Sequence, residues 1–249
     1  MGGGGGLGSA IASKLSEHGA RVVVADVDEV AAKTVAEEIE GRGGESLALR
    51  FDLSDLESFP ERLDRVREHF GAVDILVNMT GGPPPSTASG VAPEQWSDQF
   101  RSMVLGVIQF TDLVLPEMRA KGWGRIITST SSGVVAPIPN LGISNTLRAS
   151  LVAWSKTIAS EVAGDGITAN VVIPGRIATQ RIRQLDEARA KRENKTVEQV
   201  SKESTMSIPV GRYGEPAEYA APVAFLASPA ASYITGTIVR VDGGMIGSI

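Results

Sequence analysis

The sequence predicts an α/β fold: one doubly wound parallel sheet with helices on both faces. Helical and strand-like patterns alternate from one end of the chain to the other. Several of the strand-like runs are continuously apolar and rich in Val and Ile, as in strands that are covered on both faces. The 249 residues contain neither a linker nor a long repeat, so we expect a single domain over 1–249.

The elements follow one another in a regular order. Strand-like runs lie at 21–26, 46–52, 73–78, 124–130, 167–174 and 236–244. Helical stretches lie at 7–18, 28–41, 54–69, 93–119, 141–163 and 215–226. Open sheets of this kind bind ligands beyond the carboxyl ends of their strands, so each stretch that follows a strand is a candidate site.

The composition excludes several classes of function. A net charge of -5 and a pI near 5.2 argue against nucleic acid or an anionic membrane as a main partner. The chain has no cysteine, which excludes disulfides, thiolate nucleophiles and Cys-ligated zinc, and we predict no metal site. No apolar run reaches the roughly 20 residues that span a bilayer, and no signal peptide is visible. We expect a cytoplasmic protein.

The N-terminus is a glycine-rich loop that leads into a helix. Gly2 to Gly6 are consecutive, followed by Leu7 and Gly8, which together fit both G-x-G-x-x-G and G-x-x-x-G-x-G. Glycines let a backbone turn sharply and approach a pyrophosphate, whose charge then lies at the helix N-terminus near Leu7. This motif alone is weak, and a disordered glycine-rich start is the alternative. Its position before a strand and a helix makes a dinucleotide-binding sheet of the Rossmann type the better interpretation.

Asp26 ends the strand that follows, about 20 residues after the loop. An acidic residue there can bind both ribose hydroxyls of NAD and would repel the 2′-phosphate of NADP. Val27, the next residue, supplies no cation for that phosphate. We therefore predict NAD as the cofactor in preference to NADP. The alternative role is to cap the helix that starts at Asp28.

A glycine loop of this type should follow a strand, yet the chain begins at the loop. That strand would be the central one of the sheet. Its loss would leave buried backbone groups unpaired. We therefore expect a misassigned start or a trimmed chain, with the first strand missing before Met1.

Several ordered motifs resemble those of the short-chain dehydrogenase/reductase family. They are the glycines Gly2, Gly6 and Gly8; Asp52-Leu53; Asn78-Met79-Thr80-Gly81, of which Asn78 and Gly81 match the family's N-N-A-G; Ser131 after "GRIITST"; "NVVIPGRIAT" at 170–179; and "GRYGEPAEYA" and "ITGTIVRVDGG" near the C-terminus. The match covers nearly the whole chain. The nearest resemblance is to 3-oxoacyl-carrier reductases and similar sugar or alcohol dehydrogenases.

The resemblance implies an NAD(P)-dependent oxidoreductase that interconverts a small-molecule carbonyl and an alcohol. It assigns cofactor contacts to the glycine loop, to Asp52 and Leu53 at the adenine, and to Thr179 at the nicotinamide end. Further cofactor-binding positions are Asn78, Gly81, Arg148, Pro174 and Gly175. Ser131 falls on the catalytic serine. The long helices at 93–119 and 141–163 correspond to the family's dimer-forming pair, so we expect a homotetramer, or else a dimer.

The rest of the catalytic tetrad departs from the family. Ser144-x-x-x-Arg148 stands where the family has Tyr-x-x-x-Lys, and Met103 stands in place of its asparagine. A serine hydroxyl is far less acidic than a phenol and does not reach as far. Arginine keeps a positive charge but does not give up its proton. Only Ser131 of the tetrad is retained, and we take Ser131, Ser144 and Arg148 as the candidate catalytic residues.

Three interpretations follow, in this order. The first is an oxidoreductase with an altered proton path, in which Ser131 orients the carbonyl while Ser144, Arg148 and water replace the phenol. The second is non-redox lyase chemistry, because halohydrin dehalogenases resemble this chain at Ser131 and Arg148; those enzymes keep the tyrosine, however. The third is a catalytically silent, nucleotide-binding scaffold subunit, and the margin between it and the first is small.

A polar insertion at 176–209 interrupts the alternation and predicts a substrate lid. It carries Arg176, Arg181, Arg183, Arg189, Lys191, Arg192 and Lys195. With Arg148, these cations suggest an anionic substrate such as a carboxylate or an acyl-carrier phosphopantetheine, bound through Arg181. The alternative is a solvated helical face, because acidic residues alternate with the cations.

Overall fold

The computed structural model describes residues 1–248; residue 249 of the predicted domain lies outside the described part. Its strands are β1 (Val22–Asp26), β2 (Ser46–Arg50), β3 (Ile75–Asn78), β4 (Gly124–Ser129), β5 (Ile167–Pro174) and β6 (Ile238–Val241). Its α-helices are α1 (Gly6–Glu17), α2 (Glu29–Gly41), α3 (Phe59–Phe70), α4 (Pro93–Phe100), α5 (Gly106–Lys121), α6 (Gly142–Val162), α7 (Gln180–Glu193), α8 (Val197–Met206) and α9 (Pro216–Ala227). The predicted strands and helices are confirmed to within a few residues at most of their ends.

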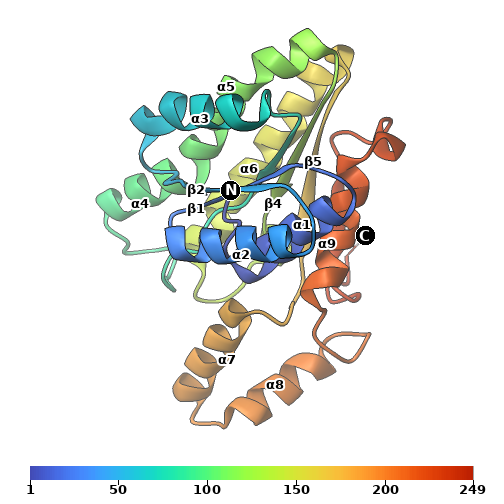
Figure 1. Cartoon of the computed structure of the whole chain (residues 1–249). Coiled ribbons are helices and arrows are strands. Elements are labelled where there is room, and N and C mark those ends of the chain that lie inside the picture. The colour runs from blue at the N-terminus through green and yellow to red at the C-terminus, as the bar shows by residue number, and fades with distance from the viewer. Residues whose placement is uncertain (249) are drawn as a thin grey trace.

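Helices cover both faces of the strands, which confirms the predicted α/β architecture (Figure 1). On one face, α1 and α9 pack against β4 and β5 through an apolar cluster that includes Ile11, Ile127 and Val223. On the other face, α3, α5 and α6 pack through a cluster that includes three aromatic rings, Phe51 and Phe59 stacked and Phe110 edge-on. Burial on both sides explains why the strands are continuously apolar.

The strands pair in parallel, but they form two separate sheets. One sheet has the order β1-β2 and the other the order β3-β4-β5-β6. No strand among residues 1–248 lies between β1 and β3. The predicted single sheet is thus divided at its centre, in the place where the sequence predicted a missing first strand.

Local signals in the sequence explain where helices start and stop. The side chain of Asp28 accepts hydrogen bonds from the backbone N–H groups of Val30 and Ala31, so it caps α2. Thr196 and Gln199 form a reciprocal capping box at the start of α8. Gly122 ends α5 in the left-handed conformation that glycine adopts without strain. These caps hold the loops between strands and helices in defined positions.

The 176–209 insertion folds into α7 and α8, which project from the body beyond the strands (Figure 1). Thr179 begins α7 by accepting a hydrogen bond from the backbone N–H of Ile182. None of the helices over residues 1–248 is long and apolar enough to cross a membrane.

Candidate active site

The predicted site residues gather around the carboxyl edge of the strands. The glycine loop meets the start of the insertion there: a Cβ on Gly6 would lie 3.1 Å from Cγ2 of Thr179. Pro174 ends β5, and a Cβ on the next residue, Gly175, would lie only 2.5 Å from Cα of Asp242. Glycine is therefore required at position 175 to let these two backbones touch.

The glycine loop fits a pyrophosphate. A Cβ on Gly8 would meet the carbonyl oxygen of Gly2 at 2.0 Å, and one on Gly4 would meet Cβ of Ala31 at 2.8 Å, so the backbone is folded back on itself. Gly5 caps α1 without a side-chain hydrogen bond, which leaves the first-turn N–H groups beside Leu7 to an anion. The resident dinucleotide of this kind of fold would lie here.

Asp26 has a structural task that the sequence did not predict. Its Oδ2 accepts the backbone N–H of Gly4 at 2.9 Å, and its Oδ1 accepts that of Asp28 at 3.0 Å. The predicted alternative, that Asp26 itself caps the helix, is wrong: Asp28 does so. Sequence reasoning also missed Arg50, an exposed cation that lies opposite Asp26 in the register of β1 and β2.

Asp52 and Leu53 lie just beyond β2 in a tight turn. The Oδ1 atom of Asp52 accepts both the backbone N–H and the hydroxyl of Ser54, and these hydrogen bonds hold the pKa of the Asp52 carboxyl below its usual range. A Cβ on Gly106 would lie 2.2 Å from the carbonyl oxygen of Leu53, so the start of helix α5 packs directly against this turn.

Polar groups without partners mark the edge beyond β3 and β4. Asn78 is fully buried, and among residues 1–248 neither its Oδ1 nor the buried hydroxyls of Thr80 and Thr130 have a hydrogen-bond partner. Buried polar atoms are normally satisfied. Unsatisfied groups at the ends of two adjacent strands favour a site that receives a polar ligand, and their positions directly after apolar runs are the signal that could have found them.

Ser144 and Arg148 are brought together on α6, as their spacing predicts. The Nε of Arg148 donates to the hydroxyl of Ser144 at 3.3 Å, and its Nη2 donates to the carbonyls of Thr80 at 3.1 Å and Gly81 at 3.0 Å. Arg148 is only 8% exposed. Burial, with the positive charge of Arg181 nearby, lowers its pKa to about 10, so it still carries its charge at neutral pH.

Ser131 lies two residues beyond the end of β4. Its hydroxyl accepts the backbone N–H of Gly133 at 3.1 Å, which caps a short turn. That turn packs against Asn145 of α6, since a Cβ on Gly133 would lie 2.3 Å from Asn145 Oδ1. The structure therefore joins Ser144 to Arg148 directly, whereas among residues 1–248 the hydroxyl of Ser131 bonds only within its own turn.

Met103 and Tyr219 are two further buried side chains near the site, and Met103 stands in place of the family's asparagine. Met103 is buried in an apolar cluster with Val107 and Ile143, so it has no polar task. The hydroxyl of Tyr219 is 2.6 Å from that of Ser129, the last residue of β4, and donates to the carbonyl of Val172 at 3.2 Å. Burial raises its pKa, so Tyr219 stays protonated and is fully engaged in the core.

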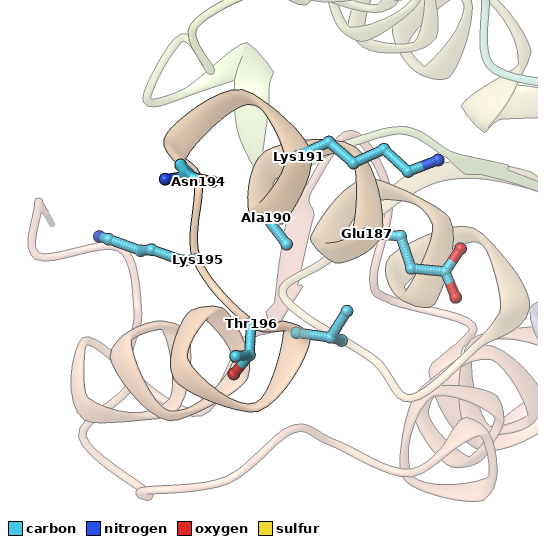
Figure 2. A pocket seen from close by; sticks show the side chains of 7 residues that line it. Glu187, Ala190, Lys191, Asn194, Lys195 and Thr196 are labelled. Atoms are coloured by element: carbon cyan, nitrogen blue, oxygen red, sulfur yellow. The ribbon is translucent and has the colours of Figure 1, made fainter.

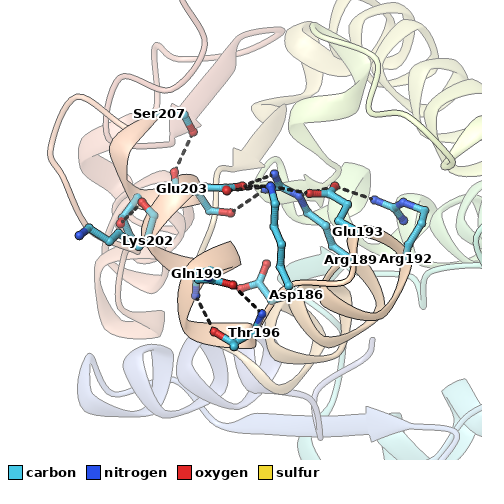
Figure 3. A network of polar contacts seen from close by, with 12 residues as sticks. Asp186, Arg189, Arg192, Glu193, Thr196, Gln199, Lys202, Glu203 and Ser207 are labelled. Atoms are coloured by element: carbon cyan, nitrogen blue, oxygen red, sulfur yellow. Dashed lines mark hydrogen bonds and ion pairs between the residues drawn. The ribbon is translucent and has the colours of Figure 1, made fainter.

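Most cations of the insertion are neutralised within it (Figure 3). Ion pairs join Arg176 to Asp186, Arg183 to Glu187, Arg189 to Glu193 and Glu203, Arg192 to Glu193, and Lys195 to Glu193 and Glu203. Arg181 differs. Over residues 1–248 it has no carboxylate in ion-pair contact, and its Nη2 donates to the carbonyl of Pro83 at 3.3 Å.

A hollow of about 420 Å³ lies between α7 and α8 (Figure 2). It is lined by Glu187, Ala190, Lys191, Asn194, Lys195, Thr196 and Val197. None of these residues belongs to the strand edge, the glycine loop or the Ser144–Arg148 pair. The hollow is therefore separate from the candidate active site. No cluster of three or more potential metal ligands occurs within residues 1–248.

A parallel α/β arrangement with a glycine loop beyond the carboxyl ends of its strands is the class of fold that binds dinucleotides. The family model described as enoyl-(acyl carrier protein) reductase matches residues 3–246. The chain is 36% identical over 242 residues to the 3-oxoacyl-(acyl-carrier-protein) reductase FabG of Vibrio cholerae, covering 96% of this chain and 93% of that protein. It is 37% identical over 243 residues to FabG of Escherichia coli, with the same coverage. The chain belongs to the short-chain dehydrogenase/reductase family.

Two solved structures of reductases have the same fold as this chain. The NADPH-dependent reductase YwfH of bacilysin biosynthesis superimposes with a TM-score of 0.94 at 30% identity, covering all of this chain and 97% of that one. Actinorhodin polyketide ketoreductase with NADPH gives 0.93 at 30% identity, covering 98% and 94%. The predicted family and fold are confirmed, and the cofactor class is a pyridine nucleotide. The first of these neighbours is NADPH-dependent and the second was solved with NADPH, which runs against the predicted preference for NAD.

Proposed function

We propose that the protein is a pyridine-nucleotide-dependent reductase of a carbonyl substrate in which a serine–arginine pair replaces the usual proton donor. The observation that carries the proposal is the hydrogen bond from Arg148 Nε to Ser144 Oγ, made by an arginine that also donates to the carbonyl of Thr80 beyond β3. It couples a cation to a hydroxyl where the family has its tyrosine and lysine. The similarity to 3-oxoacyl-carrier reductases and polyketide ketoreductase supports the reaction class.

In this mechanism some residues bind the dinucleotide and others bind the substrate carbonyl or transfer its proton. When bound, the dinucleotide supplies the hydride, and the glycine loop, Asp52 and Thr179 hold it. Ser131 orients the carbonyl oxygen by donating a hydrogen bond, which it can do because its oxygen accepts from Gly133 and its own proton is not used there. The hydroxyl proton of Ser144 is likewise free to donate, because the Ser144 oxygen accepts its hydrogen bond from Arg148.

The proton reaches the carbonyl oxygen through Ser144. The hydroxyl of Ser144 gives its proton to the developing alkoxide and takes one from water, and the fixed charge of Arg148 stabilises the negative charge that develops. Arg148 keeps its own proton throughout. A positioned acid typically contributes a factor of about 10² to 10⁴, and a serine relay supplies less of it than a phenol, so turnover is slow.

An anionic substrate is the second part of the proposal. Arg148 and Arg181 both donate to carbonyls of the 80–83 loop, and neither has a carboxylate partner over residues 1–248. The charge of Arg181 contributes to lowering the pKa of Arg148, so the two cations repel each other. An anion between them would relieve that repulsion and form charge-assisted hydrogen bonds. Five other cations of the insertion are held in ion pairs, and Arg181 is the one that contacts the same 80–83 loop as Arg148, which favours Arg181 as the residue that binds the anion.

The cofactor preference is the third part. We propose NADH over NADPH because the Asp26 carboxylate lies at the end of β1, where it would repel a 2′-phosphate. Arg50, opposite Asp26, is the group that favours NADPH instead. A fluorescence titration with NADH and with NADPH tests this preference, and tighter NADH binding that is lost in Asp26→Asn supports it. Tighter NADPH binding that is lost in Arg50→Ala contradicts it.

A catalytically silent, nucleotide-binding subunit is the second candidate. It is favoured by the double engagement of Arg148 Nη2, whose bonds to Thr80 and Gly81 brace the loop as a structural residue would. The two candidates differ in one respect. A silent subunit binds the dinucleotide but transfers no hydride to any 3-oxoacyl ester or thioester.

We also propose self-association as a homotetramer, with a dimer as the next alternative. Support comes from the helices that the resemblance assigns to the interface, which are continuous here from α4 through a π-helical turn (Arg101–Leu105) into α5, and in α6. Light scattering on the purified protein tests it, and a monomer contradicts the assignment.

Single-turnover reduction tests the function. The protein is mixed with reduced dinucleotide and a panel of 3-oxoacyl thioesters and 3-oxo acids, and the loss of nicotinamide absorbance is followed. We expect slow reduction that falls in both Ser131→Ala and Ser144→Ala. Ser150→Ala is the matched control, because Ser150 lies on the same helix and its hydroxyl donates to the backbone carbonyl of Leu147. Dinucleotide binding with no reduction of any substrate favours the silent subunit.

A further inference from the structure

Asp186, in helix α7, is the only acidic side chain that is buried among residues 1–248, with 3% of its surface exposed. Carboxylates are seldom buried unless they are paired. Its Oδ1 accepts a hydrogen bond from Nη1 of Arg176 at 2.7 Å, and its Oδ2 accepts one from the hydroxyl of Tyr213 at 2.7 Å. The guanidinium of Arg176 also lies 5.8 Å from the centre of the Tyr213 ring. We call these three contacting side chains the Asp186 cluster.

The two partners of Asp186 lie at the two ends of the segment that carries α7 and α8. Hydrogen bonds tie these ends together, because the N–H of Gly214 donates to the carbonyl of Arg176 at 2.9 Å and the N–H of Ala178 donates to that of Gly214 at 2.8 Å. Ile177 is 3% exposed and packs in the apolar cluster beside α9. Residues 176–178 and 213–214 therefore form a stem that is fixed to the body, and Asp186 joins α7 to this stem.

Helix α7 presents Arg181 on another side. Residues 181 and 186 are separated by about 140° around a helix axis and by about 7.5 Å along it. The Nη2 of Arg181 donates to the carbonyl of Pro83 at 3.3 Å, and a Cβ on Gly82 would lie 3.0 Å from the same nitrogen. The side-chain surface of a helix lies about 5–6 Å from its axis, so a rotation of about 20° moves it by about 2 Å. Such a rotation would take Arg181 out of contact with the 80–83 loop.

The other ion pairs of the insertion join α7 to α8 or to itself. Arg189 of α7 pairs with Glu203 of α8 at 2.7 Å (Figure 3), and these two side chains are 28% and 40% exposed. Water screens pairs of this kind. The side chain of Asp186 is 4% exposed, and within residues 1–248 its ion pair is the one of this insertion whose carboxylate is buried. The Asp186 cluster is therefore the strongest charged attachment of α7 to the stem.

We propose that the Asp186 cluster sets the rotation of α7 and thereby holds Arg181 against the 80–83 loop, so that Asp186 is a positioning residue for an anionic substrate. The inference rests on the anion site of the proposed function. Asp186 acts through Arg181 and makes no bond to the substrate itself. Its pairing with Arg176 also matters, because a free carboxylate on α7 would repel the anion that Arg181 attracts.

Equilibrium binding tests the proposal without any need for hydride transfer. The probes are acetoacetate, which is a 3-oxo acid, and its neutral methyl ester, each titrated by calorimetry with oxidised dinucleotide present. We expect Asp186→Ala to raise the Kd for acetoacetate about fivefold and Tyr213→Phe to raise it about twofold, with the ester little affected. Glu187→Ala is the matched control, because it removes an exposed ion pair of the same helix, and it should leave both Kd values unaltered.

A double variant shows whether Asp186 acts through Arg181. If it does, Asp186→Ala should weaken acetoacetate binding no further once Arg181→Ala is present, so the two effects are not additive. Asp186→Asn keeps an oxygen that accepts the Tyr213 hydroxyl and should recover part of the affinity. Amide hydrogen exchange over 184–190 is a readout that needs no ligand. It should be on the order of tenfold faster in Asp186→Ala and unchanged in Glu187→Ala.

The outcomes separate this inference from the proposed reductase. Unchanged acetoacetate affinity in both Asp186→Ala and Tyr213→Phe overturns the positioning role, as does an equal loss for the ester, which marks a general structural effect. Fully additive effects of Asp186→Ala and Arg181→Ala overturn it as well. A wild-type protein that binds acetoacetate no better than the ester overturns the anion site and this inference together. The expected binding pattern without any hydride transfer supports the positioning role and contradicts the reductase alone.

Discussion

The buried amino group of Met1 makes the stability of the chain depend on pH in a calculable way. Its pKa falls from the ordinary value of 8.0 to about 6, chiefly because burial disfavours the charged form, while the Asp26 charge opposes this. At about 1.36 kcal/mol per pKa unit, the difference between folded and unfolded chains corresponds to about 2.7 kcal/mol.

The unfolded chain binds more protons than the folded chain between pH 6 and pH 8. Stability therefore rises with pH across this window. Below pH 6 the group is charged in both states, so the full cost of the buried charge is present. Above pH 8 it is neutral in both states and that cost is gone.

Urea unfolding at pH 5.5 and pH 8.5 measures the effect, with mass spectrometry to confirm that Met1 is retained. The matched control is the same chain acetylated at its amino group, which has no charge to titrate. We expect the unmodified protein to gain about 2.7 kcal/mol relative to the acetylated one between the two pH values. An equal pH dependence in both proteins would refute the burial of the amino group.

Three other predictions concern single residues. Arg148→Ala should lower the free energy of unfolding by about 3 kcal/mol, because it leaves two backbone carbonyls of the adjoining loop without their charged donor, and Arg148→Lys should recover only part of this in urea titrations. Arg181→Ala should raise the KM for anionic substrates about tenfold with kcat little changed, whereas Arg183→Ala, which removes an exposed ion pair, should leave both constants unaltered; equal effects would contradict the anion site. Gly8→Ala should abolish dinucleotide binding by calorimetry, because its Cβ would lie 2.0 Å from a backbone oxygen, while Gly41→Ala, whose Cβ meets no atom of residues 1–248 within 4 Å, should bind normally.

The strands and helices could be predicted because their signals are local. Continuous apolar runs marked β4 and β5, and Asp28 and Gly122 marked helix ends where capping chemistry requires such residues. The pairing of Ser144 with Arg148 followed from their spacing of one helical turn. Each of these features depends on residues that are neighbours in the sequence.

The remaining features depend on contacts between distant segments. The carbonyls that Arg148 binds lie 67 and 68 residues away, and Ser129, whose hydroxyl is hydrogen-bonded to that of Tyr219, lies 90 residues from Tyr219. Asp26 bonds back to Gly4 across a whole helix. No periodicity or spacing reports such partners, so the sequence yields candidate site residues without showing what their side chains bond to.

The insertion illustrates the same limit. The alternation of charges in the sequence left open whether its cations bind a ligand or simply form a solvated helical face. The structure pairs five of them with nearby carboxylates and leaves Arg181 turned toward the 80–83 loop. Whether a cation is paired or available to a ligand differs from one side chain to the next, because it depends on how α7 packs against α8 and the neighbouring loop.

Hydride transfer to a 3-oxoacyl substrate tests the central claim most directly. The protein is incubated with NADH or NADPH deuterated at the transferable position together with a 3-oxoacyl thioester, and the product is analysed by mass spectrometry. A serine–arginine reductase predicts a 3-hydroxyacyl product that carries one deuterium, formed slowly and in smaller yield by Ser144→Ala. Dinucleotide that binds but leaves no deuterium in any product would contradict the account.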